Sequence, residues 1–192
     1  MKRFNLFAVP VLIVIALISV VIINPDDNKA VENSVKDNTA EPLPRGRVLQ
    51  YGIYKLVRGG KLVETPVTTT GKAISRPTIE QVEQTDRIPV KKDVYFSYQY
   101  RLSNFPASKP VVKLKRILIH PAITLPDGTI KTGSEYMIKG RVKRGEVFAF
   151  DGYAFNEHYE MVEGDWVFQI WYEDKKLIEQ TFTSYMPTTS NG

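Results

Sequence analysis

Two histidines and a group of carboxylates are the residues of this chain best suited to chemistry. His120 and His158 lie far apart in the sequence, so they lack the short His-x-His or His-x-x-x-His spacing of many zinc sites. The chain also has no cysteine, which removes thiolate ligands and thiol catalysis. The sequence therefore predicts no metal site and no cofactor.

The carboxylates gather around the second histidine and are Asp151, Glu157, Glu160 and Glu163. Two carboxylates on either side of a glycosidic bond can hydrolyse it, one as acid and the other as base or nucleophile. Loops between strands are commonly acidic, however, and the chain has no Gly-x-Ser-x-Gly motif and no glycine-rich phosphate loop. We therefore expect no catalytic residues. The alternative is a hydrolase that uses the 151–163 carboxylates, and their convergence with His158 in a concave pocket would favour it.

A second candidate site is a stripe of basic residues on two expected strands. The strand over 111–119 directs its lysines away from its apolar residues, and the strand over 136–142 does the same. If the two strands are neighbours, a basic stripe forms on one sheet face, and such a stripe can meet anionic headgroups or an acidic polymer. The alternative is a solvated face whose charges prevent aggregation. The stripe consists of Lys113, Lys115, Lys139, Arg141 and Lys143.

Aromatic residues form a third group of candidates. Alternation along 166–172 places Trp166 and Phe168 in the core with Phe182 of the following strand, whereas Trp171 faces the other way. Tyr95 similarly faces away from the core side of its strand. Exposed aromatics often mark contact sites, so Tyr95 and Trp171 are candidate contact residues, unless a loop covers them.

Strands must position all of these residues, because apolar and polar residues alternate with period two in four segments: 94–102, 111–119, 136–142 and 166–172. Turn sequences such as Arg58-Gly59-Gly60-Lys61 and Pro126-Asp127-Gly128 separate the runs. Only Thr78 to Glu83 suggests one short turn of helix. The pattern predicts an all-β fold, an antiparallel immunoglobulin-like β-sandwich. A β-barrel is the alternative.

The organisation of the chain follows from its composition. Residues 4–24 carry no charge and, as a helix, extend about 30 Å, the thickness of a bilayer core. Residues 25–46 are polar and predict a flexible linker, 47–186 hold the sandwich, and 187–192 form a disordered tail. Formal net charge is only +5 over the whole chain, which by itself indicates no polyanionic partner.

The apolar segment 4–24 predicts a transmembrane signal anchor. Lys2 and Arg3 precede it and two aspartates follow it, which places residues 1–3 in the cytoplasm. The chain would then cross the inner membrane once, with the domain on the periplasmic side. Cleavage is the alternative and would release the domain to the periplasm. We favour the anchor because the apolar run is long for a signal peptide and no Ala-x-Ala site follows it.

Two stretches of the domain resemble an uncharacterised bacterial family of small exported domains of unknown function. One is Tyr51-Gly52-Ile53-Tyr54, and the other runs from Glu160 to Thr183 through Gly164-Asp165-Trp166. The resemblance implies an envelope protein with a sandwich-like domain and carries over no catalytic residue. Similar proteins usually begin with a cleavable signal, from which this chain departs.

Taken together, these features predict a membrane-anchored bacterial envelope domain that acts as a non-catalytic binding or scaffolding module. The membrane is one partner, through residues 4–24, and an envelope protein or an anionic polymer is the other. Nucleic acid is not expected outside the membrane. The alternative function is an envelope hydrolase that uses the 151–163 carboxylates.

Overall fold

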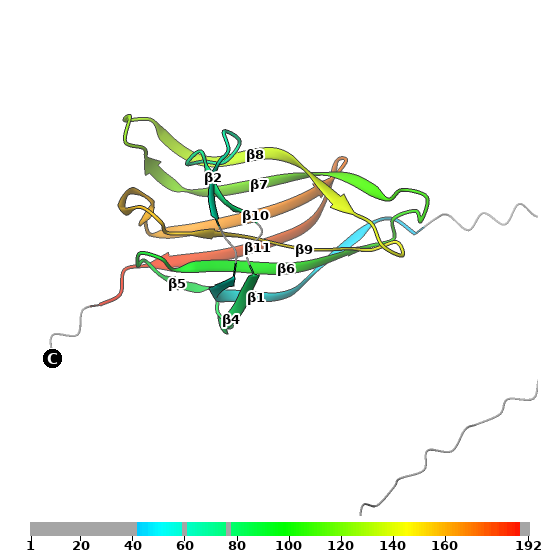
Figure 1. Cartoon of the computed structure of the whole chain (residues 1–192), viewed down its shortest axis with the longest axis horizontal. Helices are drawn as coiled ribbons and strands as arrows, with labels where there is room; N and C mark the ends of the chain where they lie inside the picture. Colours follow the sequence, from blue (N-terminus) through cyan, green and yellow to red (C-terminus); the bar gives the residue numbers. More distant parts are fainter. Residues whose placement is uncertain (1–41, 59–60, 76–77, 189–192) are drawn as a thin grey trace, which may run out of the picture. The chain divides into compact units, whose positions relative to one another are not determined.

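Two β-sheets packed face to face form the domain (Figure 1), and the computed structural model describes residues 42–58, 61–75 and 78–188. The first sheet has the strand order β4-β1-β6-β9, formed by Thr78–Glu83, Arg45–Arg58, Tyr95–Ser103 and Val147–Ala154. The second has the order β5-β11-β10-β7-β8, formed by Arg87–Pro89, Lys175–Tyr185, Gly164–Tyr172, Val111–Thr124 and Ile130–Arg141. A small separate pair consists of β2 (Lys61–Glu64) and β3 (Lys72–Ser75).

The predicted all-β sandwich is confirmed, and the closed barrel is wrong. Within the described residues, each sheet ends in strands with one neighbour, β4 and β9 in the first sheet and β5 and β8 in the second. A barrel would pair these edges. The pairing is antiparallel except between β5 and β11, which run parallel.

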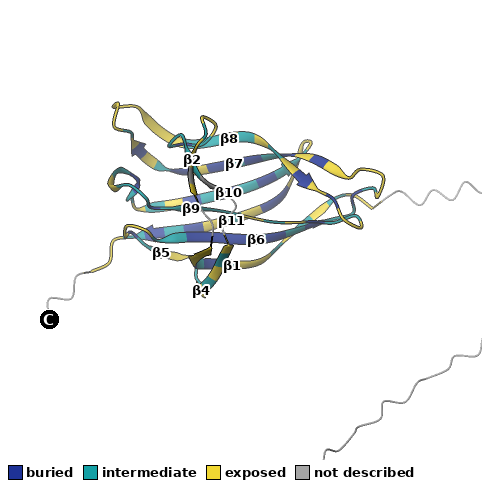
Figure 2. Cartoon of the chain, viewed as in Figure 1, coloured by how far each residue is buried: buried dark blue, intermediate teal, exposed yellow. Residues whose placement is uncertain are grey.

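Alternation of side chains explains why these segments form strands. In β6, Phe96, Tyr98, Tyr100 and Leu102 are buried, while Gln99 and Arg101 between them are half-buried on the other face. Figure 2 shows the same banding of buried and exposed residues along the long strands. Period-two burial of this kind is the signature of strands with one face in a core.

Two elements, β4 and the 3-10 turn at His158–Glu160, differ from the sequence expectations. Thr78 to Glu83 form β4 and not a turn of helix, because they pair with β1. Gln81 of β4 also donates a hydrogen bond from Nε2 to the Tyr51 carbonyl at 2.8 Å. Gly52 lets β4 approach, since its φ is +146° and a Cβ there would lie 1.9 Å from the Glu83 carbonyl oxygen. The only helical element of the described residues is a 3-10 turn, η1 (His158–Glu160).

The core is an aromatic cluster between the two sheets. Phe96 of the first sheet lies against Trp166, Phe168 and Phe182 of the second, with ring centroids 5.2 to 6.2 Å apart. All four side chains are fully buried. Aromatic pairs at these distances stabilise a core beyond the area that they bury.

A buried serine satisfies the one polar atom of Trp166. Its Nε1 donates to Ser184 Oγ at 3.0 Å, and the Ser184 hydroxyl donates in turn to the Val162 carbonyl at 2.7 Å. This chain of hydrogen bonds ties the segment before β10 to β11. A large indole can be fully buried here because its N–H has a partner.

The membrane segment expected at 4–24 lies outside the described residues, as do most of the linker and the end of the tail. Among the helices of the described part, none is long and apolar enough to cross a membrane. β1 begins at Arg45, two residues before the expected start of the domain.

We predict that Ser184→Ala lowers the free energy of unfolding by about 1–3 kcal/mol, because the buried Trp166 N–H and the half-buried Val162 carbonyl lose their partner. Thr183→Ala, one residue away, removes only an exposed bond to Asp165 and serves as the control. Urea unfolding followed by near-UV circular dichroism measures both. Equal effects of the two substitutions would show that the buried bond contributes nothing special.

Candidate functional site

A pocket of about 350 Å³ lies where the sandwich is open, at the edge between β8 and β9. Its lining includes residues of β7 and β8 from the second sheet and residues of β9 from the first, with Tyr95 of β6. Thr68, Thr69 and Thr70 from the connection between β2 and β3 line it as well, as do Lys72 and Ala73 at the start of β3. Asn156 and Glu160 complete the lining. The volume is at the lower end of the range of small-molecule sites.

An ion pair between the two sheets forms the base of the pocket. Arg116 of β7 donates from Nε to Asp151 Oδ2 at 2.7 Å and from the terminal Nη2 to Oδ1 at 3.2 Å. Arg116 is 4% exposed, so its charge must be paired within the protein. Burial lowers the pKa of Arg116, but the Asp151 carboxylate more than offsets this, so the net direction is upward.

Further groups hold the guanidinium in place. Its second terminal nitrogen donates to Ser134 Oγ at 3.1 Å. The guanidinium carbon lies 5.2 Å from the ring centroid of Tyr136 and 5.6 Å from that of Phe168, within the range of cation–π contacts. Asp151 also accepts from the Gly152 backbone N–H at 2.8 Å. Both members of the pair are therefore fixed before any ligand arrives.

Glu160 is the second carboxylate of the pocket and is also bound by donors. Its oxygens accept from the backbone N–H groups of Asn156 and Glu157 at 2.7 and 2.8 Å and from the Tyr153 hydroxyl at 3.0 Å. Burial raises the pKa of Glu160, although these three hydrogen bonds act in the opposite direction. The carboxylate thus holds η1 and the end of β9 together.

His120 sits beside the pocket lining in a structural role. Its Nδ1 lies 2.7 Å from the Pro121 carbonyl, which can only accept, so Nδ1 carries the proton and Nε2 accepts from the Thr69 hydroxyl at 2.9 Å. The ring stacks on Trp166 at 5.1 Å between centroids. Burial lowers the pKa of His120, so the neutral form is favoured. This contact fixes the segment between β2 and β3 to β7.

The acidic segment is only partly assembled by the fold. Asp151 and Glu160 line the same pocket. Glu157 instead pairs with Lys72 at 3.2 Å, Glu163 accepts from the Met186 backbone N–H, and His158 is exposed on η1. The full convergence with His158 that would favour a hydrolase does not occur.

The strands of the basic stripe are neighbours, as the hypothesis requires. Lys113 lies directly opposite Lys139 in the β7–β8 ladder, and Val111 lies opposite Arg141. Lys115 faces the same side and places its Nζ 5.4 Å from the Trp171 ring centroid. Lys143 follows β8 in the turn to β9, where its backbone forms an isolated antiparallel β-bridge with that of Glu146. The stripe therefore holds four residues on the sheet and one beyond it.

Neither aromatic contact candidate is fully exposed. Tyr95 lines the pocket and lies against Tyr54, with ring centroids 6.4 Å apart, and burial raises the pKa of Tyr95 to about 12. Trp171 is half-buried beneath Lys115, and its Nε1 donates to Gln169 Oε1 at 2.9 Å. Tyr95 thus belongs to the pocket, and Trp171 belongs to the outer face of the second sheet.

The sequence expectations lacked Arg116 and several other lining residues, among them Lys72, Ser134 and Tyr136. Arg116 occupies a core-facing position of β7 between Leu114 and Leu118, where alternation predicts an apolar residue. A charged residue at such a position requires a buried partner, and this signal was present in the sequence. The described residues contain no group of three or more His, Asp or Glu side chains suited to hold a metal ion.

The model of a family described as a domain of unknown function, DUF3859, matches residues 43–184. The chain belongs to this family. The resemblance seen in the sequence is thereby confirmed. No curated protein matches the chain.

Solved structures support the fold. An immunoglobulin-like protein from Pseudomonas aeruginosa matches with a TM-score of 0.51 and 21% identity, over 76% of this chain and 99% of that one. At this identity the match shows the immunoglobulin-like fold of this DUF3859 member and nothing of its function. An alkylpurine DNA glycosylase from Pseudomonas fluorescens also matches, at a TM-score of 0.33 and 9% identity over 52% of this chain and 27% of that one. A β-glucosidase from Listeria innocua matches with a TM-score of 0.35 and 7% identity, over 56% of this chain and 16% of that one. Because their TM-scores are below 0.5, these last two matches show nothing about this chain.

We predict that Asp151→Asn lowers the free energy of unfolding by about 3–5 kcal/mol, because Arg116 is left buried with an unpaired charge. Asp174→Asn in the exposed β10–β11 turn is the matched control and should change stability by less than about 0.5 kcal/mol. Thermal and urea unfolding measure both. A loss at Asp151 no larger than at the control would contradict the structural role of the ion pair.

We also predict that His120 stabilises the domain only at neutral and higher pH. Its folded-state pKa lies below the ordinary value of 6.5, so the unfolded chain takes up the proton first and stability falls as the pH drops below about 6.5. Glu160, with its raised pKa, acts in the opposite direction, so we compare the chain with His120→Gln, in which the Glu160 contribution is unchanged. The stability difference between the two proteins should shrink as the pH falls. Parallel curves of melting temperature against pH would overturn this assignment.

Proposed function

We propose that this DUF3859 protein is a non-catalytic binding module of the bacterial envelope, tethered to the membrane by residues 4–24. The observation that carries the proposal is the pocket at the β8–β9 edge. Its two carboxylates are occupied, Asp151 by Arg116 and Glu160 by three donors. A general acid or base must be free to reach the proton that it transfers, and a carboxylate held by internal donors is poorly suited to this.

The pocket lining favours a neutral polar ligand. Its charged side chains balance, since Arg116 and Lys72 stand against Asp151 and Glu160. The remaining lining offers hydroxyl and amide groups together with aromatic rings: Thr68, Thr69, Thr70, Ser134, Asn156, Tyr95, Tyr136, Tyr153 and Phe150. Such a surface suits a sugar unit of an envelope polymer or a polar side chain of an envelope protein.

The second candidate function is the envelope hydrolase. It is favoured by one observation, namely that Asp151 and Glu160 line the same pocket. A hydrolase would require the Arg116 pair to open when substrate binds. The fixed hydrogen bonds around both carboxylates favour the binding module.

Photo-crosslinking in intact cells tests the pocket. A photoreactive amino acid replaces Phe150, which lines the pocket and is 42% exposed, in the full chain. The control replaces Ile130, which is 65% exposed and does not line the pocket. We expect an adduct with one envelope component at position 150 and none at 130. The same products from both positions would contradict a pocket ligand. A glycan-cleaving activity abolished by Glu160→Gln, in a variant that near-UV circular dichroism shows to be folded, would establish the hydrolase.

Fractionation of cells tests the tether. The full chain should sediment with the membrane and resist alkaline extraction, because an apolar helix of this length is held by the bilayer core. A chain lacking residues 4–24 should stay soluble in the cytoplasm, since it lacks the export signal as well as the anchor. Release of the full chain by alkali, or its recovery in the periplasmic extract, would show cleavage or the absence of an anchor.

A further inference from the structure

One end of the sandwich is strongly basic, and it is the end at which the chain enters β1. We call it the basic end. Its charged residues lie at the starts of β1, β7, β9 and β11 and at the ends of β6, β8 and β10. The basic residues are Arg45, Arg47, Arg101, Lys109, Arg141, Lys143, Arg144 and Lys175, and the acidic residues are Glu146, Glu173 and Asp174.

Contacts between the strand ends show that these residues form one surface. Arg45 pairs with Ser103, and the Phe105 N–H donates to the Gly145 carbonyl at 3.1 Å. The Val142 N–H donates to the Pro110 carbonyl, which joins the end of β8 to the start of β7. The Phe105 ring lies 5.1 Å from that of Tyr172, which brings in the β10–β11 turn.

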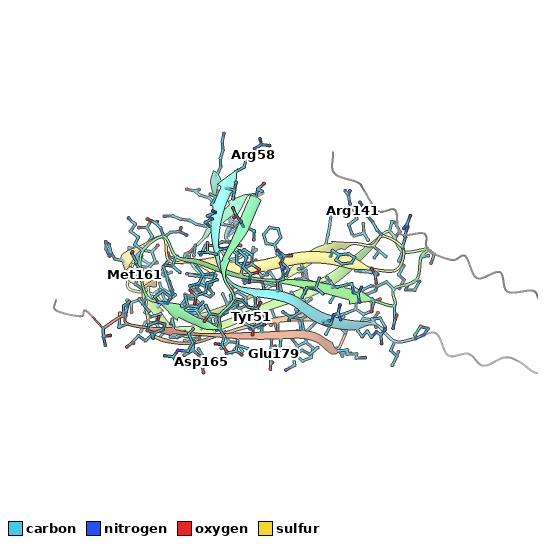
Figure 3. All side chains as sticks on the ribbon, turned by 90° about the horizontal axis from the view of Figure 1, so that it is seen from below. Tyr51, Arg58, Arg141, Met161, Asp165 and Glu179 are labelled. Carbon is cyan, nitrogen blue, oxygen red and sulfur yellow. The ribbon has the colours of Figure 1, made fainter. Side chains whose placement is uncertain are left out.

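The opposite end of the sandwich has the reverse balance. Figure 3 shows Arg141 and Met161 far apart, near the two ends. Around Met161 and the β7–β8 turn the acidic residues outnumber the basic ones. The acidic residues are Asp86, Asp93, Asp127, Glu157, Glu160, Glu163 and Asp165, and the basic ones are Lys72, Arg87, Lys91, Lys92 and Lys131. The domain is thus polarised in charge along its strands.

Three arginines of the basic end surround a shallow cavity. Arg47 lies directly opposite Arg101 in the β1–β6 ladder, and like charges opposed in this way are destabilising. Arg45 completes the cavity, which is lined by Arg45, Gly46, Arg47, Arg101 and Ser103 and has a volume of about 350 Å³. Among the described residues, the one ion pair to these arginines joins Arg101 to Glu146 at 3.6 Å, and both side chains remain about one-third exposed.

An exposed aromatic ring lies beside the arginines. Phe148 pairs with Arg101 across the β6–β9 ladder and is 61% exposed. Clustered arginines can bind phosphate oxygens in a bidentate manner, and a neighbouring apolar ring can enter the headgroup region of a bilayer. Both features occur together on the same sheet face.

We propose that the basic end docks on the anionic phospholipid surface of the membrane, with a phosphate of a lipid headgroup in the cavity of Arg45, Arg47 and Arg101. Charge complementarity selects this occupant, and so does the path of the chain, since the segment leading from residues 4–24 reaches the domain at Arg45. The proposal rests on the tether proposed above. It adds an orientation, in which the opposite end and the β8–β9 pocket face away from the bilayer.

Fluorescent labels at the two ends of one hairpin test the orientation. The chain has no cysteine, so Val111→Cys at the basic end and Ile130→Cys at the opposite end each give a single site. Both positions are exposed. Ile130 pairs with Thr124 at the far end of β7, so the rise of a strand places the two positions about 40 Å apart. The full chain is reconstituted into vesicles of phosphatidylcholine with or without phosphatidylglycerol, and a quencher is attached to a lipid headgroup.

We expect strong quenching at residue 111 in the vesicles that contain phosphatidylglycerol, little at residue 130, and loss of the difference in high salt, which screens surface charges. Arg45→Glu with Arg47→Glu should abolish the quenching at residue 111. Lys91→Glu with Lys92→Glu, an equal change of charge at the opposite end, should leave it intact. Near-UV circular dichroism confirms that both variants are folded.

The outcomes separate this inference from the proposed tether. A full chain that floats with both kinds of vesicle but shows equal quenching in them overturns the docking alone. Quenching that survives the arginine substitutions also overturns it, because the arginines are then not the contact. A chain that floats with neither vesicle disproves the tether, and the docking orientation falls with it.

Discussion

A charge buried between two sheets sets the main constraint on this domain. Arg116 takes a core-facing position of β7, so a carboxylate must meet it from the facing sheet, and Asp151 of β9 does so through two hydrogen bonds. This pair ties the β9 edge to β7, while Ser134 holds the guanidinium from β8. The sandwich edge therefore stays open at a fixed width around a polar pocket, where apolar side chains would have closed it.

The rest of the pocket depends on similar internal satisfaction. Glu160 closes the turn after β9 by accepting three hydrogen bonds, and His120 joins β7 to the segment between β2 and β3 through Thr69. Among the described residues, two buried hydroxyls have no partner, those of Tyr54 and Tyr98, and neither residue lines the pocket. A rigid lining with its charges paired favours recognition over proton transfer, and the immunoglobulin-like fold seen in the Pseudomonas protein provides the frame for it.

Most of the fold follows from sequence patterns, but the site does not. Alternation in Val94 to Leu102 and in Trp166 to Tyr172 is enough to predict sandwich strands with one buried face, because each is decided by local sequence. Thr78 to Glu83, by contrast, suggests one short turn of helix in the sequence, and only its pairing with β1 makes it a strand. The pocket joins Arg116 to Asp151 and Thr69 to His120, and such contacts between distant segments depend on strand order, which periodicity does not encode.

The claim that the Arg116–Asp151 pair builds the pocket is tested most directly by a double-mutant cycle. Arg116→Met, Asp151→Leu and the double variant are compared in their free energies of unfolding. Removing one charge leaves the other buried without a partner, whereas replacing both leaves apolar groups in contact. The double variant should therefore be at least about 2 kcal/mol more stable than the sum of the single effects predicts. Additive effects would contradict the claim and would mean that the two side chains do not depend on each other.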